Sequence, residues 1–297
     1  MKNMNKAFPM SLALFVVVAS DCAAKEPAYR RLGAEPRPLY TQGSEERFSR
    51  RYQIGLNGSF SLSNISGDVV VRGGSGEEVV LEAVKRVHRS RGENDIRRLL
   101  ESVDIDVSHT RNRVRVTTRH SRGRGEHRRG RSHVSVDYEI TVPGGTEVSV
   151  KCVSGNVELH DLDGETTAES VSGDVTLRRV EHLVLAKSVS GDVTVSAAAS
   201  PADLEISSVS GDVEIGTVSA EELDVSSVSG DVRISQASCE RATVHSVSGD
   251  IRYGESLTPS GRYDFKSHSG DVHIVLSESP GFELEAKTFS GEIESDF

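Results

Sequence analysis

Val209-Ser210-Gly211-Asp212-Val213 is one copy of a motif, Ser-Gly followed by an acidic or amide residue and then Val or Ile, that occurs nine times in this chain of 297 residues. The first copy contains Gly67, and the glycines of the other eight are Gly155, Gly173, Gly191, Gly211, Gly230, Gly249, Gly270 and Gly291. The steps between these eight glycines are 18, 18, 20, 19, 19, 21 and 21 residues. A short repeat of nearly constant period predicts a stack, in which each unit buries its apolar face only against its neighbours.

Apolar residues alternate with polar ones on both sides of the glycine, which we number as position 0 of its unit. In the unit of Gly211, Val213 and Ile215 lie at positions +2 and +4, and Leu204 and Ile206 lie at −7 and −5. Alternation at period two with β-branched residues predicts a short strand on each side of the glycine corner. Position −2 is Val in six units. It lies an even number of residues from +2 but an odd number from −5, so strict alternation would place it on the same face as +2. We therefore expect the chain to change face between −3 and −2, at a bend or bulge that also turns these valines inward.

The even spacing predicts parallel, in-register stacking, because coils of equal length place like positions over like positions about 4.8 Å apart. The predicted fold class is all-β, a parallel β-solenoid with two short strands in each coil of about 19 residues. Residues 146–297 are expected to form its eight Ser-Gly-Asp coils, with the glycines as structural corners. Aromatic residues near the C-terminus, from Tyr253 and Tyr263 to Phe282, Phe289 and Phe297, are expected to close the apolar core at that end.

Residues 51–145 are predicted to be an N-terminal β-rich part of the solenoid. Apolar residues from Phe60 to Val71 occupy the template's positions around Gly67, so the solenoid is expected to begin here and then to be interrupted. Glu93–Leu100 is predicted to form one short helix that opens with acidic residues. Strands are predicted at Val79–Leu81, Val103–Val107, Val114–Thr118 and Val134–Val142.

Two columns of small residues precede the glycine. Position −1 is Ser in all eight stacked copies, and position −3 is Cys152, Ser170, Ser188, Ser208, Ser227, Ser246, Ser267 and Thr288. A serine hydroxyl both donates and accepts, so these residues can bond to one another or to backbone groups of the corner. A row of nucleophiles would need an adjacent general base, and none recurs with the serines. We therefore expect a structural hydrogen-bond ladder.

Position +1 is almost always acidic. The column reads Asn156, Asp174, Asp192, Asp212, Asp231, Asp250, Asp271 and Glu292. Neighbouring like charges about 4.8 Å apart repel by roughly 0.9 kcal/mol in water before screening, so something must offset the repulsion. Each carboxylate either caps a corner N–H, as Asp commonly does in turns, or shares a divalent cation such as Ca²⁺ with its neighbours. The known calcium β-roll has paired glycines and a nine-residue period, which this chain lacks, so we favour capping and expect no cofactor. The six aspartates remain weak metal candidates.

The N-terminus is typical of an exported protein. Lys2 and Lys6 precede a short apolar run, and small residues at Cys22 and Ala24 suit a cleavage point, so residues 1–24 are predicted to be a signal peptide. Cys22 also allows a lipid anchor, but Asp21 beside it fits that motif poorly. Residues 25–50 are polar with three prolines and are predicted to be a flexible leader. The mature protein is then expected in the periplasm or at the cell surface, without a transmembrane helix.

Charge divides the chain into two parts. Residues 146–297 hold 10 Lys and Arg against 28 Asp and Glu, a net charge of −18, and residues 1–145 hold 25 against 17, a net charge of +8. The positive charge is concentrated in residues 119–133, which contain Arg119, Arg122, Arg124, Arg128, Arg129 and Arg131. This loop is either an anion-binding site for envelope polysaccharide or acidic lipid or a solvated hairpin tip. Its histidines, His120, His127 and His133, are a weak metal signal. Nucleic acid is not expected as a partner, because export and the absence of aromatic platforms both argue against it.

The sequence Val136–Thr146, VDYEITVPGGT, followed by repeated Val-Ser-Gly-Asp-Val, resembles the bacterial putative-adhesin family of β-strand-repeat proteins, a former domain of unknown function. Asn64–Val71 is similar to the opening coil of the same family. The resemblance covers about residues 55–297. It implies an exported, envelope-associated β-solenoid and carries over no catalytic or ligand residues.

These observations favour a non-enzymatic scaffold or adhesion protein of the cell envelope or surface, whose partner is a polysaccharide, a lipid or another envelope protein. A sensor protein in envelope-stress signalling is the alternative. A polysaccharide-active enzyme on a β-helix is a third reading, but it would need a local cluster of acids and bases in a groove, and no such cluster stands out in the sequence.

Overall fold

The computed structural model describes residues 45–90, 92–120, 134–255, 257–258, 260–276, 281–288 and 292–296. The predicted signal peptide, residues 25–44 of the predicted leader and Arg122–Arg131 of the basic loop lie outside the described residues. No helix within the described residues is long and apolar enough to cross a bilayer.

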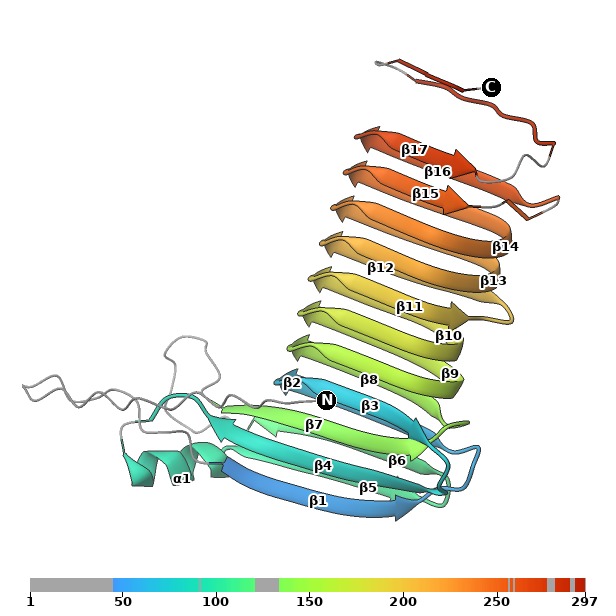
Figure 1. Cartoon of the computed structure of the whole chain (residues 1–297). Coiled ribbons are helices and arrows are strands. Elements are labelled where there is room, and N and C mark those ends of the chain that lie inside the picture. The colour runs from blue at the N-terminus through green and yellow to red at the C-terminus, as the bar shows by residue number, and fades with distance from the viewer. Residues whose placement is uncertain are drawn as a thin grey trace, which may run out of the picture. The chain divides into compact units, whose positions relative to one another are not determined.

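The repeat region is a parallel β-solenoid, as predicted (Figure 1). Four strands run from position +2 of one corner to position −1 of the next: β9 Val157–Ser172, β10 Val175–Ser190, β13 Val213–Ser229 and β14 Val232–Ser248. Three strands begin at +2 and end before the next corner: β11 Val193–Ala199, β15 Ile251–Glu255 and β17 Val272–Leu276. Three others end at −1: β8 Glu147–Ser154, β12 Asp203–Ser210 and β16 Arg262–Ser269. Like positions pair across coils. Val213 lies opposite Val232 and Ser229 opposite Ser248, and the glycines stack one upon another from Gly155 to Gly270.

The two predicted strands of a coil join into one bent strand in the shorter coils. In the two 18-residue coils the bend is made at position +6, where Asp161 and Arg179 adopt the left-handed conformation with φ of 58° and 54°. In the 20-residue coil the segment after Ala199 separates β11 from β12, and in the 21-residue coil a longer segment separates β15 from β16. Variation in coil length is therefore absorbed at this outer bend, and the glycine corner is the same in every coil.

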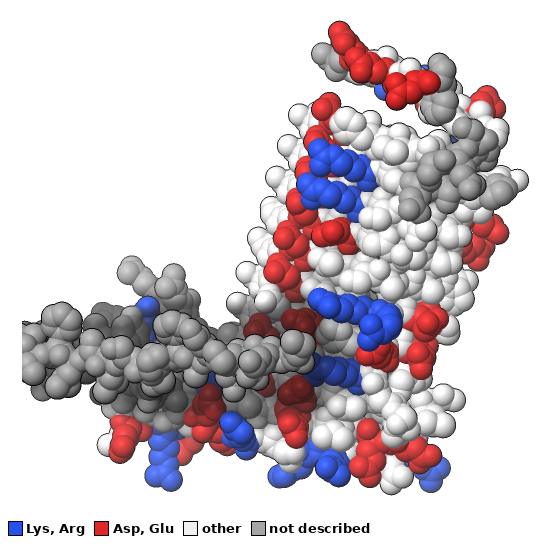
Figure 2. Space-filling model, viewed as in Figure 1, with Lys and Arg blue, Asp and Glu red and all other residues white. Residues whose placement is uncertain are grey.

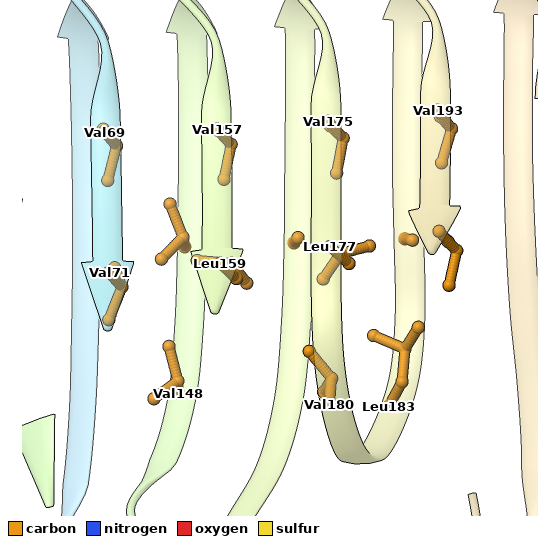
Figure 3. Packing of buried hydrophobic residues seen from close by; sticks show 14 of the residues in the cluster. Val69, Val71, Val148, Val157, Leu159, Val175, Leu177, Val180, Leu183 and Val193 are labelled. Carbon is orange, nitrogen blue, oxygen red and sulfur yellow. The ribbon is translucent and has the colours of Figure 1, made fainter. Parts of the chain in front are cut away.

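Inward side chains form continuous apolar rows through the stack (Figure 3). Val69, Val157, Val175 and Val193 make one row at position +2, and each is fully buried. Parallel pairing places like side chains over each other, so each row packs at the strand spacing. Burial of this apolar surface against neighbouring coils is the main driving force for stacking.

The expected inward orientation of the valines at position −2 is wrong. In the coil of Gly211, positions −7, −5 and −3 are buried, whereas Val209 at −2 is 39% exposed and Ser210 at −1 is exposed as well. The inside of the corner is filled by the small side chain at −3, such as Ser208, which is 3% exposed. The chain therefore changes face after −2, with two successive residues outside, and this local irregularity lets +2 point inward again.

The first coil lies where the sequence predicts it, before an insertion. β2 Ser59–Ser66 pairs in parallel with β8, and β3 Val69–Gly74 pairs in parallel with β9. The insertion comprises β4 Glu78–Val87, helix α1 Glu93–Glu101, β5 Val103–Thr110, β6 Arg113–His120 and β7 Val134–Pro143. These bounds confirm the predicted helix and the four predicted strands.

Antiparallel strands cover the N-terminal end of the stack. β6 and β7 add to β2 and β3 in parallel, and β5 and β4 then add to β6 and β7 in antiparallel orientation. β1 Glu45–Gln53 pairs with β4 along its whole length. The assignment of residues 45–50 to the leader is therefore wrong. They form a strand because β4 offers an open edge and because Phe48 and Tyr52 pack against the core.

At the C-terminal end, Tyr253, Tyr263 and Phe265 pack as an aromatic cluster, with ring centroids 5.2–6.4 Å apart. The predicted last coil is not formed by its described residues. Residues 281–288 and 292–296 contain no strand and are exposed, and Phe282 lies outside the cluster at 39% exposure. The template's inward positions do not explain this difference, because the coil of Gly173 holds Thr166 and Ala168 at two of its four inward positions and is formed. Phe289 and Phe297 are outside the described residues.

Gly211→Ala is expected to lower the free energy of unfolding by about 1–3 kcal/mol. Its φ lies outside the left-handed range, but a Cβ at this position would collide with the carbonyl group of Gly191 in the preceding coil. Gly76→Ala is the matched control, because the nearest atom to its added Cβ is the backbone nitrogen of Glu78 at 3.9 Å. Urea unfolding of both variants measures the difference, and equal midpoints would show that the corner tolerates a side chain.

Candidate binding surface at the glycine corner

The side chain at position +1 accepts a hydrogen bond from the backbone N–H of the +1 residue in the next coil. The Oδ1 atom of Asp192 accepts the N–H of Asp212, and Oδ1 of Asp212 accepts the N–H of Asp231, both at 2.9 Å. The same bond recurs along the column at 2.8–3.0 Å. We call this column the acidic ladder; it consists of Asp68, Asn156, Asp174, Asp192, Asp212, Asp231, Asp250 and Asp271.

The acidic ladder replaces a backbone acceptor that the bend removes. At the corner, the N–H of Gly173 donates to the carbonyl of Ser190, and the N–H of Val175 donates to the carbonyl of Asp192, both in the next coil. The N–H between them belongs to Asp174 and donates instead to the side chain of Asn156 in the preceding coil. A short side chain with a carbonyl or carboxylate oxygen is what this position needs. The expected capping of a corner N–H is thus made between coils.

The serine ladder at position −3 completes the corner. The hydroxyl of Ser188 donates to the carbonyl oxygen of Gly173 at 2.9 Å, and the hydroxyl of Ser208 donates to that of Gly191 at 2.9 Å. Ser170, Ser227, Ser246 and Ser267 make the same bond at 3.1–3.5 Å. The predicted structural ladder is therefore confirmed for position −3. The serines at −1 are exposed and contribute backbone groups to the corner.

Charge along the acidic ladder is compensated unevenly. Arg233 reaches across two coils, with Nη1 3.0 Å from Oδ2 of Asp212 and Nη2 2.7 Å from Oδ2 of Asp231. Arg252 lies 3.5 Å from Asp250. The N–H of Asp231, together with Arg233, holds the pKa of Asp212 below its usual value. Asp174 and Asp192 are exposed, and within the described residues neither has an ion-pair partner.

A stripe of exposed valines runs beside the acidic ladder. The valine stripe consists of the six residues at position −2, Val153, Val171, Val189, Val209, Val228 and Val247, each 38–49% exposed. The exposed serines at −1 lie between the valine stripe and the acidic ladder in the sequence of every coil. Figure 2 shows the acidic side chains in a line along the corner edge of the stack, with basic side chains beside its upper part. We call the valine stripe, these serines and the acidic ladder together the corner ridge.

Sequence reasoning identified the acidic ladder but missed the valine stripe. A signal was present at position −3, because it continues the inward alternation of −7 and −5, and position −2 then points outward. Of the predicted basic loop, the structure describes Arg119, which forms an ion pair with Asp106 at 2.9 Å. Among the residues that the structure describes, no three His, Cys, Asp or Glu side chains are grouped so as to hold a metal ion.

An open depression on another side of the stack gathers polar groups. Its lining includes Arg113, Glu147, Asp163, Glu165 and His182. Its volume is about 410 Å³, and it is open to solvent over most of its wall.

Residues 113–297 match the model of the Toastrack DUF4097 family. The chain belongs to this family. The predicted resemblance to a putative-adhesin family of unknown function is thereby confirmed. No curated protein matches the chain.

Several solved structures are similar to this Toastrack protein. A putative adhesin from Bacteroides fragilis NCTC 9343 is 19% identical, with a TM-score of 0.45 over 78% of this chain and 98% of that one. A putative lipid binding protein from Parabacteroides distasonis ATCC 8503 is 12% identical, with a TM-score of 0.40 over 78% and 97% of the two chains. A putative cell adhesion protein from Clostridium sporogenes ATCC 15579 is 8% identical, with a TM-score of 0.34 over 79% and 100%.

Asp192→Asn is expected to leave the stability of the Toastrack protein unchanged or slightly higher. Asn keeps the oxygen that accepts the N–H of Asp212, as Asn156 already does for Asp174, and it removes like-charge repulsion. Asp192→Ala loses the acceptor and should cost about 1 kcal/mol. Thermal unfolding distinguishes the two.

Calcium should raise the melting temperature no more than magnesium does. A calcium-specific rise would instead establish a metal site, if the combined change of Asp192, Asp212 and Asp231 to Asn abolishes that rise.

Asp212→Asn should behave differently from Asp192→Asn, because Arg233 pairs with Asp212. The folded-state pKa of Asp212 lies below its usual value of 3.8. Ionised Asp212 therefore stabilises the fold above pH 4 or so, and this contribution is lost as the pH falls through the lowered pKa. Since both side chains are partly exposed, the loss in Asp212→Asn at pH 7 should stay below about 1 kcal/mol. Urea unfolding at pH 7 and pH 3 tests the prediction, which fails if the variant is equally destabilised at both.

Proposed function

We propose that this protein is an exported, non-enzymatic scaffold or adhesion module of the cell envelope or surface. The observation that carries the proposal is the corner ridge, in which the same exposed side chains recur at the strand spacing over six successive coils. A periodic surface of this kind suits many equal weak contacts along an extended partner, as in other solenoids. A catalytic site instead concentrates its groups at one place.

The hydrogen bonds of the corner also support this function. The N–H groups, the glycine carbonyl and the −3 hydroxyl are all paired between coils, so the ridge is held rigidly along its length. A rigid surface loses little conformational entropy when it binds a partner. The rest of the surface, at positions +3 and +5, varies from coil to coil with residues such as Thr176, Glu214 and Arg233, and this variation would tune the affinity for a partner.

Export and envelope binding can be measured together. The full chain, expressed in a bacterial host with its own N-terminus, should fractionate with the periplasm or envelope, and mass spectrometry should place the mature N-terminus at Lys25. Cys22→Ser should leave the fractionation and the mature N-terminus unchanged. If the protein were instead anchored by a lipid on Cys22, this change would abolish the anchor. The purified mature protein should co-sediment saturably with isolated envelopes and be displaced by unlabelled protein. Retention of the full-length chain in the cytoplasm, or binding that never saturates, would contradict the proposal.

A further inference from the structure

The valine stripe is an apolar surface outside the core of the stack. Its six side chains point away from the core, and each keeps 38–49% of its surface exposed. Single exposed apolar residues are ordinary on a protein surface, whereas a continuous apolar patch with a polar rim marks an interaction site. The next outward position on the same strands, −4, is polar in every one of these coils: Lys151, Glu169, Lys187, Ser207, Ser226 and His245. The apolar surface is therefore narrow, straight and confined to the corner.

The acidic ladder, on the +1 side of the valine stripe, favours a cationic partner. Asp174 and Asp192 use Oδ1 for the backbone of the next coil, which leaves Oδ2 at the surface. Arg233 shows how a guanidinium fits this edge, since it bridges the Oδ2 atoms of Asp212 and Asp231 in adjacent coils at 3.0 and 2.7 Å. Basic side chains of a partner can bind Asp174 and Asp192 in the same way. The net charge of −18 over residues 146–297 adds long-range attraction for such a partner.

The period of the valine stripe selects the conformation of the partner. Six valines at a strand spacing of about 4.8 Å extend over about 24 Å. An α-helix presents one face every 5.4 Å, so it drifts from the valines by only about 3 Å over five steps. An extended strand presents one face roughly every 6.8 Å and drifts by about 10 Å. A second copy of this chain would match the period but would bring two acidic ladders together.

We propose that the corner ridge binds a basic amphipathic α-helix of about 16 residues, which lies along the stack with its apolar face on the valine stripe and its basic flank on Asp174 and Asp192. The inference rests on the proposed function, because it names the partner of the same surface. The helix belongs to another polypeptide, and apolar anchors spaced i, i+3 or i+4, and i+7 are the recognition mode it would use.

The test uses the purified full-length protein and synthetic peptides. The probe is a fluorescent 18-residue helical peptide with leucine on one face and arginine on its flanks. The controls are a peptide of the same composition with the leucines scattered around the helix and a peptide with glutamate in place of arginine. Fluorescence anisotropy should show saturable binding of the probe and at least tenfold weaker binding of both controls. Equal binding of the probe and the scattered peptide would overturn the proposal.

Two sets of variants locate the binding. Changing Val171, Val189 and Val209 together to Thr keeps β-branched side chains on the surface and should weaken binding at least tenfold. Val184→Thr is the matched control, because Val184 is 40% exposed in β10 but lies off the stripe. Changing Asp174 and Asp192 to Asn should weaken binding and reduce its salt dependence, and Glu205→Gln should do neither. Unfolding midpoints check that each variant is folded. Loss of binding in Val184→Thr as large as in the stripe variant would refute the assignment.

Self-association and envelope binding separate the remaining possibilities. If sedimentation equilibrium shows that the unchanged protein forms dimers and the stripe variant does not, the occupant of the ridge is a second copy and the helix proposal is wrong. If envelopes still bind the protein but the probe peptide does not, the helix proposal fails while the proposed function stands. If the probe binds through the stripe but envelopes do not bind, the proposed function fails and the peptide site remains.

Discussion

Close backbone contact between successive glycine corners is the constraint on which the rest of the structure depends. Each corner glycine lies so near the carbonyl of the glycine before it that a Cβ would collide with that group, as at Gly191 and Gly211. At this distance the bend leaves one N–H per coil without a backbone acceptor. The carboxylate or amide at position +1 accepts that N–H, and the hydroxyl at −3 donates to the glycine carbonyl, so the residue types at −3 and +1 follow from hydrogen-bond satisfaction at one bend. Charge repulsion along the acidic ladder is tolerated because each ionised oxygen accepts a backbone N–H from the next coil.

The corner ridge is partly a consequence of this geometry and partly independent of it. Because the small −3 residue fills the inside, positions −2 and −1 must both lie outside, and the Oδ2 atoms of the acidic ladder are left at the surface. The fold does not require valine at −2, however, since the same position is occupied by His268 in the last formed coil. Each stripe valine is 38–49% exposed, so packing within the stack covers the rest of its surface and explains part of the preference for an apolar residue. The part that stays exposed is the surface that a partner would cover.

The repeat period alone was enough to predict the parallel stack, the rows of inward side chains and the interrupted first coil, because period and parity translate directly into register. Three features needed coordinates. The −2 valines point outward because two successive residues, −2 and −1, both lie outside. Parity counting instead placed the change of face one residue earlier, between −3 and −2. The partner of each +1 side chain lies in a neighbouring coil, and only the register shows which coil and which atom. Strand formation at residues 45–50 depends on the open edge of β4, more than 30 residues away in sequence.

Differences in coil length have no effect on the spacing of the corner ridge, because they are all placed at the opposite bend. Coils of 18 residues turn there through a single left-handed residue, such as Asp161 or Arg179, and in the coils of Gly191 and Gly249 a segment at this bend separates two strands. Hydrogen bonds at the corner keep the same partners in both cases, from Asp174 to Asp271. A partner bound along the ridge therefore meets equally spaced side chains, whatever the length of each coil. Insertions and deletions can change the outer bend without moving any residue of the ridge, so the two sides of one coil are free to serve different purposes.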